Sequence, residues 1–182
     1  IFDETLIDYK GNILEGSAFD VNVLLQYKDK TLSPADIKYP LFKAKKDDKE
    51  YTIVPMAGSG LWGPVWGFVS FESDYVTIYG VSFSHRKETP GLGAEINTSI
   101  FEEPFKGKKT INKDGVFVSI KVKKGGAEEG NLHQVDAITG GTITSDGVSD
   151  MLYKTLDVYN SYFDFLREEN QTIDTLITDT IM

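Results

Sequence analysis

A long amphipathic stretch near the C-terminus constrains this chain most. Beyond Ser145, residues that are almost all apolar recur at steps of three and four: Val148, Met151, Leu152, Thr155, Leu156, Tyr159, Tyr162, Phe163 and Leu166. This spacing places them on one face of an α-helix. Ser145 or Thr144 is a suitable N-cap for that helix. From Glu169 to Met182 the periodicity is weak, so this tail is expected to be partly disordered or to form a short helix of its own.

Five segments in the rest of the chain are predicted to be strands, the first and the last of them because apolar residues alternate along them. They cover residues 19–27, 51–55, 66–72, 75–85 and 115–123. The strand at 51–55 should stop at Pro55, and a glycine-rich turn, 58–60, should follow it. A Ser-Asp turn between the third and fourth strands predicts a hairpin, and 115–123 shows the clearest alternation. Short helices are expected at 32–37 and within 94–103. The predicted fold is α+β, a single domain with a mainly antiparallel sheet and a long C-terminal helix.

Composition excludes several classes of function. The 182 residues include 28 acidic and 19 basic side chains, and a net charge of −9 argues against nucleic acid as a partner. There is no cysteine, which excludes disulfides, thiolate zinc sites and cysteine nucleophiles. The two histidines, His85 and His133, lie far apart and lack the spacing of a metal motif. No metal site is therefore predicted. The sequence also shows no candidate general base or hydride-donor site, so no catalytic residue is predicted.

The loop before the predicted helix has the composition of an anion site. It reads Thr139-Gly140-Gly141-Thr142-Ile143-Thr144-Ser145. Two glycines allow a tight turn and a close approach to a ligand. A helix start adds unpaired amides and the positive end of the helix dipole, which suit a phosphate. No lysine is present, so this is not a Walker loop. The alternative is that the four hydroxyls only cap the helix.

Two further segments stand out because glycines flank chemically distinctive residues. Glu88 to Glu95 reads Glu-Thr-Pro-Gly-Leu-Gly-Ala-Glu and follows a predicted strand. It matches a dinucleotide fingerprint only in part, because the third glycine and the βαβ context are missing, so taken alone it is a turn. Gly60-Leu61-Trp62-Gly63 places an indole on a glycine turn. Trp62 could line a planar ligand or fill the core.

In this order, the three segments resemble the FMN-binding domain superfamily. The similarity is strongest to the C subunits of sodium-translocating NADH:quinone reductases and weaker to the homologous G subunits of Rnf complexes. It runs from about Tyr51 to Phe165, so the expected division is a loosely matched part at 1–50, an FMN-binding core at 51–168 and a tail at 169–182. The family's flavinylation motif is Asp, two variable residues, Ser or Thr, Gly, Ala, Thr. It appears here as Asp136 to Thr142, with Gly141 in place of alanine.

This resemblance implies a covalent flavin. The phosphate of FMN would be joined to the Thr142 hydroxyl in a phosphoester bond that a separate flavin transferase makes. Thr142 would then be a modified residue and not a catalytic nucleophile. The other residues implied at the cofactor are Thr139, Gly140, Gly141, Ile143 and Thr144 around the phosphate and ribityl chain, Glu88, Thr89, Leu92 and Gly93 at the isoalloxazine ring, and Leu61 and Trp62 beside it.

The resemblance also implies a role in electron transfer. The chain would be a one-electron relay within a membrane-bound, sodium-translocating NADH:quinone reductase, with no catalysis of its own. Its partners would be the other subunits of that complex, one of which carries another covalent FMN, and the flavin transferase during maturation. An N-terminal transmembrane helix, missing from this fragment, would hold the domain at the periplasmic side of the bacterial inner membrane. The alternatives are an Rnf G subunit, a module that binds flavin or another phosphate ligand reversibly, and a structural interaction domain.

Overall fold

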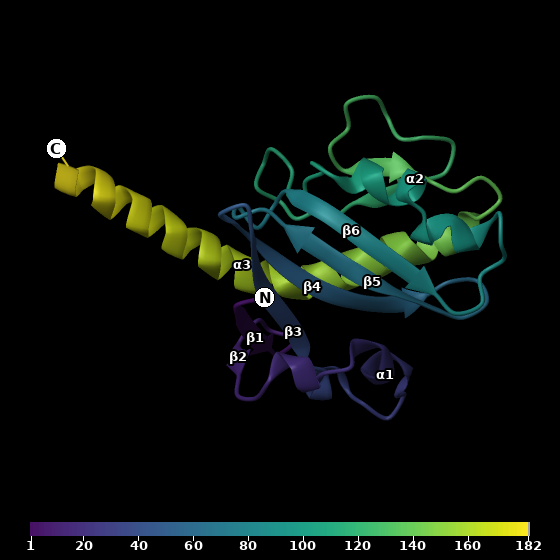
Figure 1. Ribbon diagram of the computed structural model, residues 1–182, viewed down its shortest axis with the longest axis horizontal. Helices are drawn as coiled ribbons and strands as arrows, with labels where there is room; N and C mark the ends of the chain where they lie inside the picture. The colour runs from purple at the N-terminus through teal and green to yellow at the C-terminus, as the bar shows by residue number, and fades with distance from the viewer. Residues whose placement is uncertain (182) are drawn as a thin grey trace.

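Six antiparallel strands form one twisted sheet, and a single long helix lies across one of its faces (Figure 1). The computed structural model describes residues 1–181. The order of the strands in the sheet is β2-β1-β3-β4-β5-β6. Their bounds are β1 Asp3–Ile7, β2 Ile13–Leu14, β3 Tyr39–Lys46, β4 Lys49–Ser59, β5 Pro64–Phe71 and β6 Ile78–His85. With helix α3, Thr142–Ile181, this confirms the predicted α+β class and the predicted long C-terminal helix.

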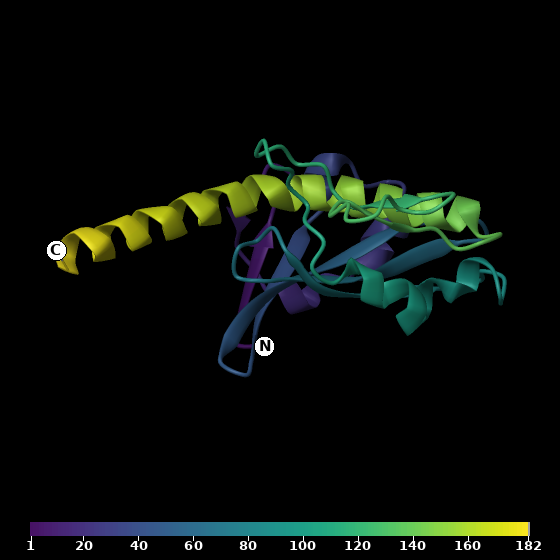
Figure 2. The same ribbon diagram turned by 90° about the horizontal axis from the view of Figure 1, so that it is seen from above.

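Shorter elements complete the fold around α3. A parallel pair, β7 (Lys121–Lys123) and β8 (Gln134–Asp136), packs on the helix through Val122, whose amide donates to Ser149 Oγ at 2.8 Å. Seen from above, α3 passes close to this part of the chain and continues well beyond the sheet (Figure 2). The remaining short helices are η1 Ala18–Asp20, α1 Val23–Lys28, η2 Pro34–Asp36, η3 Gly93–Asn97, α2 Ser99–Glu102 and η4 Glu103–Phe105. The predicted short helices at 32–37 and 94–103 are thus confirmed, mainly as 3-10 turns.

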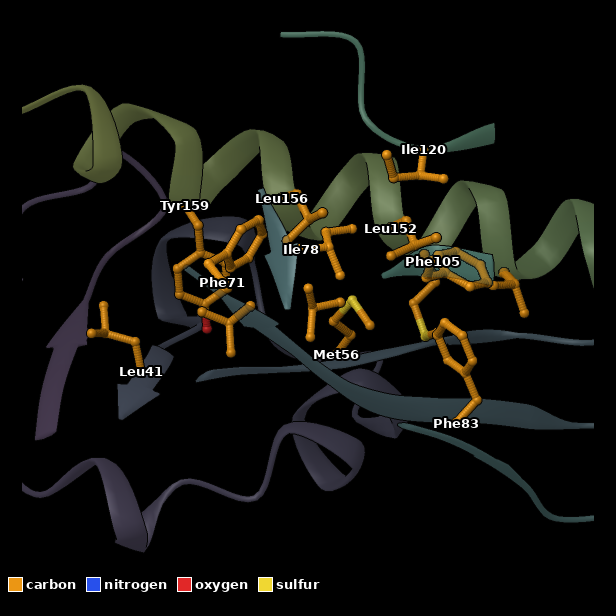
Figure 3. Packing of buried hydrophobic residues seen from close by; sticks show 14 of the residues in the cluster. Leu41, Met56, Phe71, Ile78, Phe83, Phe105, Ile120, Leu152, Leu156 and Tyr159 are labelled. Carbon is orange, nitrogen blue, oxygen red and sulfur yellow. The ribbon is translucent and has the colours of Figure 1, made fainter. Parts of the chain in front are cut away.

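The apolar stripe of α3 forms the core with the sheet. Every residue of the predicted stripe is buried except Thr155, which is partly exposed. Leu152 and Leu156 face Met56 and Phe71 of the sheet (Figure 3). Tyr159 is fully buried, and its hydroxyl donates to the carbonyl of Pro40 at 2.6 Å. Burial raises the pKa of this hydroxyl well above its usual range, so it remains a neutral donor that ties the helix to β3.

The expected strand at 19–27 is wrong. This segment contains η1 and α1. Asn22 explains the difference, because its side chain accepts a hydrogen bond from the Leu25 amide at 2.9 Å and so caps α1. A local cap of this kind stabilises a helix start that the alternation of apolar residues does not reveal.

The expected strand at 115–123 is also wrong over most of its length. Only Lys121–Lys123 pairs as a strand. Gly115 and Ser119 have φ angles of +78° and +58°, which turn the backbone twice within five residues. The alternating valines therefore do not share one face, and Val116 is 56% exposed whereas Val122 is buried.

The expected stop of a strand at Pro55 is wrong, because β4 continues to Ser59 and includes Gly58 of the expected turn. Strand β3 pairs with β4 only as far as Ile53. Beyond this point β4 has an open edge on that side, where a residue without an amide proton is tolerated. By contrast, the predicted hairpin is confirmed, with β5 and β6 paired antiparallel.

Helix α3 begins at Thr142, four residues before the expected start after Ser145, and continues without a break to Ile181. Thr144 and Ser145 therefore lie inside its first turn and are not N-caps. The separate or disordered tail expected after Glu169 is wrong for the described residues, because the sequence from there to Ile181 contains no proline or glycine to end the helix. Met182 lies outside the described residues. Within residues 1–181 we find no helix long and apolar enough to cross a bilayer.

The backbone at the start of α3 packs directly against the backbone at the end of β4. A Cβ atom added to Gly147 would stand 2.0 Å from the carbonyl oxygen of Ser59, and one added to Gly58 would stand 2.7 Å from Met151 Cβ. Both glycines are therefore needed for the helix and the strand to pack this closely.

We predict that Gly147→Ala destabilises the protein by about 1–3 kcal/mol through overpacking. Helix propensity alone predicts the opposite sign, a gain of about 1 kcal/mol for alanine over glycine. Urea unfolding measures the change. Gly63→Ala is the control, because nothing lies within 4 Å of its added Cβ, and it should be close to neutral. A Gly147→Ala variant more stable than wild type would show that the helix and strand do not meet as described.

Candidate functional site

Three loops that are distant in sequence meet at the first turn of α3 and enclose a small pocket. They are the β4–β5 loop, the segment after β6 and the β8–α3 loop. The pocket has a volume of about 210 Å³. It is lined by Leu61, Glu88, Thr89, Leu92, Gly93, Gly140, Gly141, Thr142, Ile143 and Thr144. The structure thus brings together the residues that the sequence singled out, apart from Thr139 and Trp62, which do not line the pocket.

A buried carboxylate connects the three loops. Glu88 is only 5% exposed. Its Oε1 accepts a hydrogen bond from the Trp62 amide at 2.9 Å, and its Oε2 accepts one from the Thr144 hydroxyl at 2.5 Å. The backbone amide of Glu88 is in turn 3.3 Å from His85 Nδ1, to which it donates. One side chain therefore fixes the glycine turn, the segment after β6 and the helix start relative to one another.

Two glycines make room for this carboxylate. A Cβ atom on Gly60 would stand 2.6 Å from Glu88 Oε1, and one on Gly93 would stand 2.6 Å from Glu88 Oε2 and 2.3 Å from Thr144 Oγ1. These distances are shorter than any side chain could accept. Gly60 and Gly93 are therefore needed for close packing around Glu88, whether or not they also contact a ligand.

The helix start provides the polar end of the pocket. Gly140 has a φ angle of +75°, and a Cβ there would meet Leu92 Cδ2 at 2.6 Å, so only glycine suits this turn. The first amides of α3 have no acceptor within the helix, and they form the positive end of its dipole. Thr142 is the first helical residue and lines the pocket. This arrangement suits a phosphate group.

Two of the four hydroxyls of this loop form hydrogen bonds within the protein. Thr144 donates to Glu88, and Ser145 Oγ accepts a hydrogen bond from the Ile138 amide at 3.1 Å. Both residues are buried. Within residues 1–181, the hydroxyls of Thr142 and Thr139 have no hydrogen-bond partner, and of these two only Thr142 lines the pocket.

Exposed apolar side chains surround the pocket's mouth. Leu61 is 46% exposed, Leu92 40% and Ile143 58%, and Trp62 beside them is 62% exposed. Trp62 therefore does not fill the core. A group of large exposed apolar side chains next to convergent polar groups is typical of a ligand site. The pocket is smaller than common ligand cavities of about 300–1000 Å³, so part of a nucleotide-sized ligand would lie over these apolar side chains.

Two contacts that support this site were not predicted from the sequence. The Ser145–Ile138 bond closes the loop before the helix, and His85 holds the amide of Glu88. The spacing of three residues between His85 and Glu88 was the available signal for the second contact. A separate, mainly apolar cavity of about 280 Å³ lies between α1 and α3, and it includes none of the predicted site residues.

Comparison of the sequence with known protein families gives a match that includes this site. A family model described as an FMN-binding domain matches residues 60–157, which is more than half of the chain and includes all three loops. The chain belongs to the FMN-binding domain family. FMN is therefore the cofactor that the loops are expected to hold.

Curated relatives narrow the similarity to one kind of subunit. The C subunit of the Na⁺-translocating NADH-quinone reductase of Vibrio alginolyticus is 42% identical over 103 residues, which are 57% of this chain and 40% of that protein. The protein of the same name from Vibrio anguillarum is 35% identical over 158 residues, which are 79% of this chain and 62% of that protein. The chain thus spans less than two thirds of the length of these relatives.

Solved structures extend the similarity to the whole fold. The corresponding C subunit from Parabacteroides distasonis superposes with a TM-score of 0.79 at 42% identity, covering 90% of this chain and 78% of that one. NqrC of Shewanella oneidensis gives a TM-score of 0.77 at 27% identity, covering 91% and 84%. The resemblance to the C-subunit family that the motifs indicated is confirmed.

We predict that Gly93→Ala destabilises the protein by about 1–3 kcal/mol, because the added methyl group must break the Glu88–Thr144 hydrogen bond or displace the loop. Urea unfolding is again the measurement. Gly80→Ala is the control, since its added Cβ would meet only Ser70 Oγ, at an ordinary 3.7 Å. Equal stability of the two variants would contradict the packing described around Glu88.

Proposed function

We propose that this chain carries FMN covalently, with the flavin phosphate joined to Thr142 Oγ1 in a phosphoester bond, and that it serves as an electron-transfer subunit. The observation that carries this proposal is the position of Thr142. Its hydroxyl lies at the first residue of α3, in a pocket formed by glycine loops, and has no partner among the described residues.

The other hydroxyls nearby are less suitable for such a bond. Attachment at Thr144 or Ser145 would require the loss of a buried hydrogen bond, which costs about 1–3 kcal/mol for each group left unsatisfied. Thr139 lies outside the pocket. At Thr142 the negative phosphate would also meet the amides and the dipole of α3, which favour an anion at this end of a helix.

The remaining pocket residues suit the rest of the cofactor. Leu61, Leu92 and Ile143 present apolar surface on which an isoalloxazine ring can pack, and Trp62 extends that surface. Thr89 and Glu88 provide polar groups near the ring, and Gly93, Gly140 and Gly141 let the backbone approach the ribityl chain. FMN would supply the redox chemistry, while the chain would position it and set its electrostatic surroundings. Thr142 would hold the flavin without reacting further.

The proposed setting is a sodium-translocating NADH:quinone reductase, because the relatives named above are C subunits of that enzyme. The chain would pass single electrons between other subunits and would have no catalysis of its own. A flavin transferase would attach the FMN. The domain would face the periplasm, held at the inner membrane.

A second candidate function is reversible binding of flavin or another phosphate ligand by the same loops. The observation that favours it is that glycine turns and the start of α3 line the pocket. Such elements can bind phosphate without a covalent bond. The two candidates differ in whether the flavin stays with the chain after unfolding.

We predict that co-expression with a flavin transferase adds the mass of one FMN less one water to the wild-type chain, and that the denatured chain stays yellow. Thr142→Ala should abolish both signals, because the acceptor oxygen is gone. Thr155→Ala is the matched control and should retain them, because Thr155 lies on the same helix, is partly exposed and does not line the pocket. Intact-mass spectrometry and absorbance of the denatured protein are the measurements. Modification that persists in Thr142→Ala, or an unmodified wild type alongside a transferase shown active on another substrate, would overturn the covalent proposal.

A further inference from the structure

Glu88 is a buried ionisable residue in the wall of the pocket. Its carboxyl group is buried, and within residues 1–181 no lysine, arginine or histidine forms an ion pair with it. Burying a carboxylate without a cation is costly unless hydrogen bonds compensate. A residue that only filled space here could be apolar at lower cost, so the carboxyl group needs an explanation in terms of what it contacts.

Both carboxylate oxygens accept hydrogen bonds from the pocket walls. Oε1 receives the Trp62 amide at 2.9 Å, and Oε2 receives the Thr144 hydroxyl at 2.5 Å. Trp62 is on the exposed β4–β5 turn, whereas Thr144 is in the first turn of α3. Apart from these two bonds through Glu88, no hydrogen bond between the described residues joins this turn to the helix start.

The surroundings pack closely around the carboxyl group. Gly60 and Gly93 flank its two oxygens so closely that a Cβ on either glycine would overlap them. Glu88 also lines the pocket together with Thr142 and Leu92. Its charge therefore lies at the wall of the cavity and is shielded from water by burial.

We propose that Glu88 is a positioning residue with two effects: it fastens the Gly60–Trp62 turn to the first turn of α3, and its negative charge makes the flavin in this pocket harder to reduce. The second effect rests on the proposed function. It follows because reduction adds an electron to the flavin, and a nearby anion in a poorly solvated wall disfavours added negative charge.

The side-chain chemistry allows the two effects to be separated. In Glu88→Gln the amide oxygen can still accept from Trp62, and the amide NH₂ can donate to Thr144, whose hydroxyl then acts as acceptor. This variant removes the charge and keeps the connection. Glu88→Ala removes both. Thr144→Val removes one hydrogen bond with little change of shape, and Thr144→Ser restores the hydroxyl.

The connection is tested on the flavin-free protein by hydrogen exchange of the Trp62 amide. We expect exchange on the order of tenfold faster in Glu88→Ala than in wild type, since this amide loses its acceptor, and near wild-type exchange in Glu88→Gln. Thr144→Val should speed the exchange and Thr144→Ser should not, which provides a second test if Glu88→Ala does not fold. Unchanged Trp62 exchange in both Glu88→Ala and Thr144→Val would overturn the connection.

The charge effect is tested by the midpoint potential of the flavin-loaded protein in a redox titration. We expect Glu88→Gln to raise that potential. The matched control is Glu102→Gln, because Glu102 also accepts a backbone amide, that of Phe83 at 2.6 Å, yet does not line the pocket. It should leave the potential unchanged. An unchanged or lowered potential in Glu88→Gln would overturn the charge effect.

The outcomes separate this inference from the proposed function. A wild-type chain that takes up no flavin from an active transferase would overturn the proposed function and the charge effect with it. The exchange of the Trp62 amide would still support or overturn the connection, because that measurement needs no flavin. A loaded wild type whose potential does not respond to Glu88→Gln would leave the proposed function intact and overturn the charge effect alone.

Discussion

The contact between the start of helix α3 and the end of β4 is the constraint on which the rest of the structure depends. Gly147 lies against the carbonyl of Ser59 with no room for a Cβ atom. The first turns of the helix therefore pack on the sheet backbone to backbone, with no side chain between them. The apolar stripe that follows fixes the helix over the core. Because the start of the helix packs this closely on the sheet, the loops on either side of it lie together and line one pocket.

In this arrangement some hydroxyls at the helix start bond to the protein, and another is available to a ligand. The hydroxyls of Thr144 and Ser145 are buried and bonded to the protein, where they fix the neighbouring loops. The hydroxyl of Thr142 lies among the unpaired amides of the first turn and stays available to a ligand. The exposed apolar side chains, Leu61, Leu92 and Ile143, then provide a surface suited to a planar ring. The residues of the pocket therefore suit FMN, the cofactor after which the matched family is named. The position of Thr142 supports the proposed phosphate link.

Sequence patterns could predict the parts of this fold that depend on interactions within short segments. The stripe of α3 and the loop residues were readable because periodicity and glycine content are properties of short segments. The strands expected at 19–27 and 115–123 failed because the Asn22 cap and the positive φ of Ser119 override alternation. The contacts of Glu88 could not be predicted at all, since they join residues 26 and 56 positions apart in the chain. Only the fold brings Trp62 and Thr144 to the same carboxylate.

A crystal structure of the flavin-loaded chain is the most direct test of the phosphate link at Thr142. We expect electron density that is continuous from Thr142 Oγ1 to the phosphate of FMN, with the phosphate at the first amides of α3 and the ring against Leu92. Glu88 should remain bonded to Trp62 and Thr144. Density that links the phosphate to another residue, such as Thr139, or a flavin bound away from the start of α3, would contradict it.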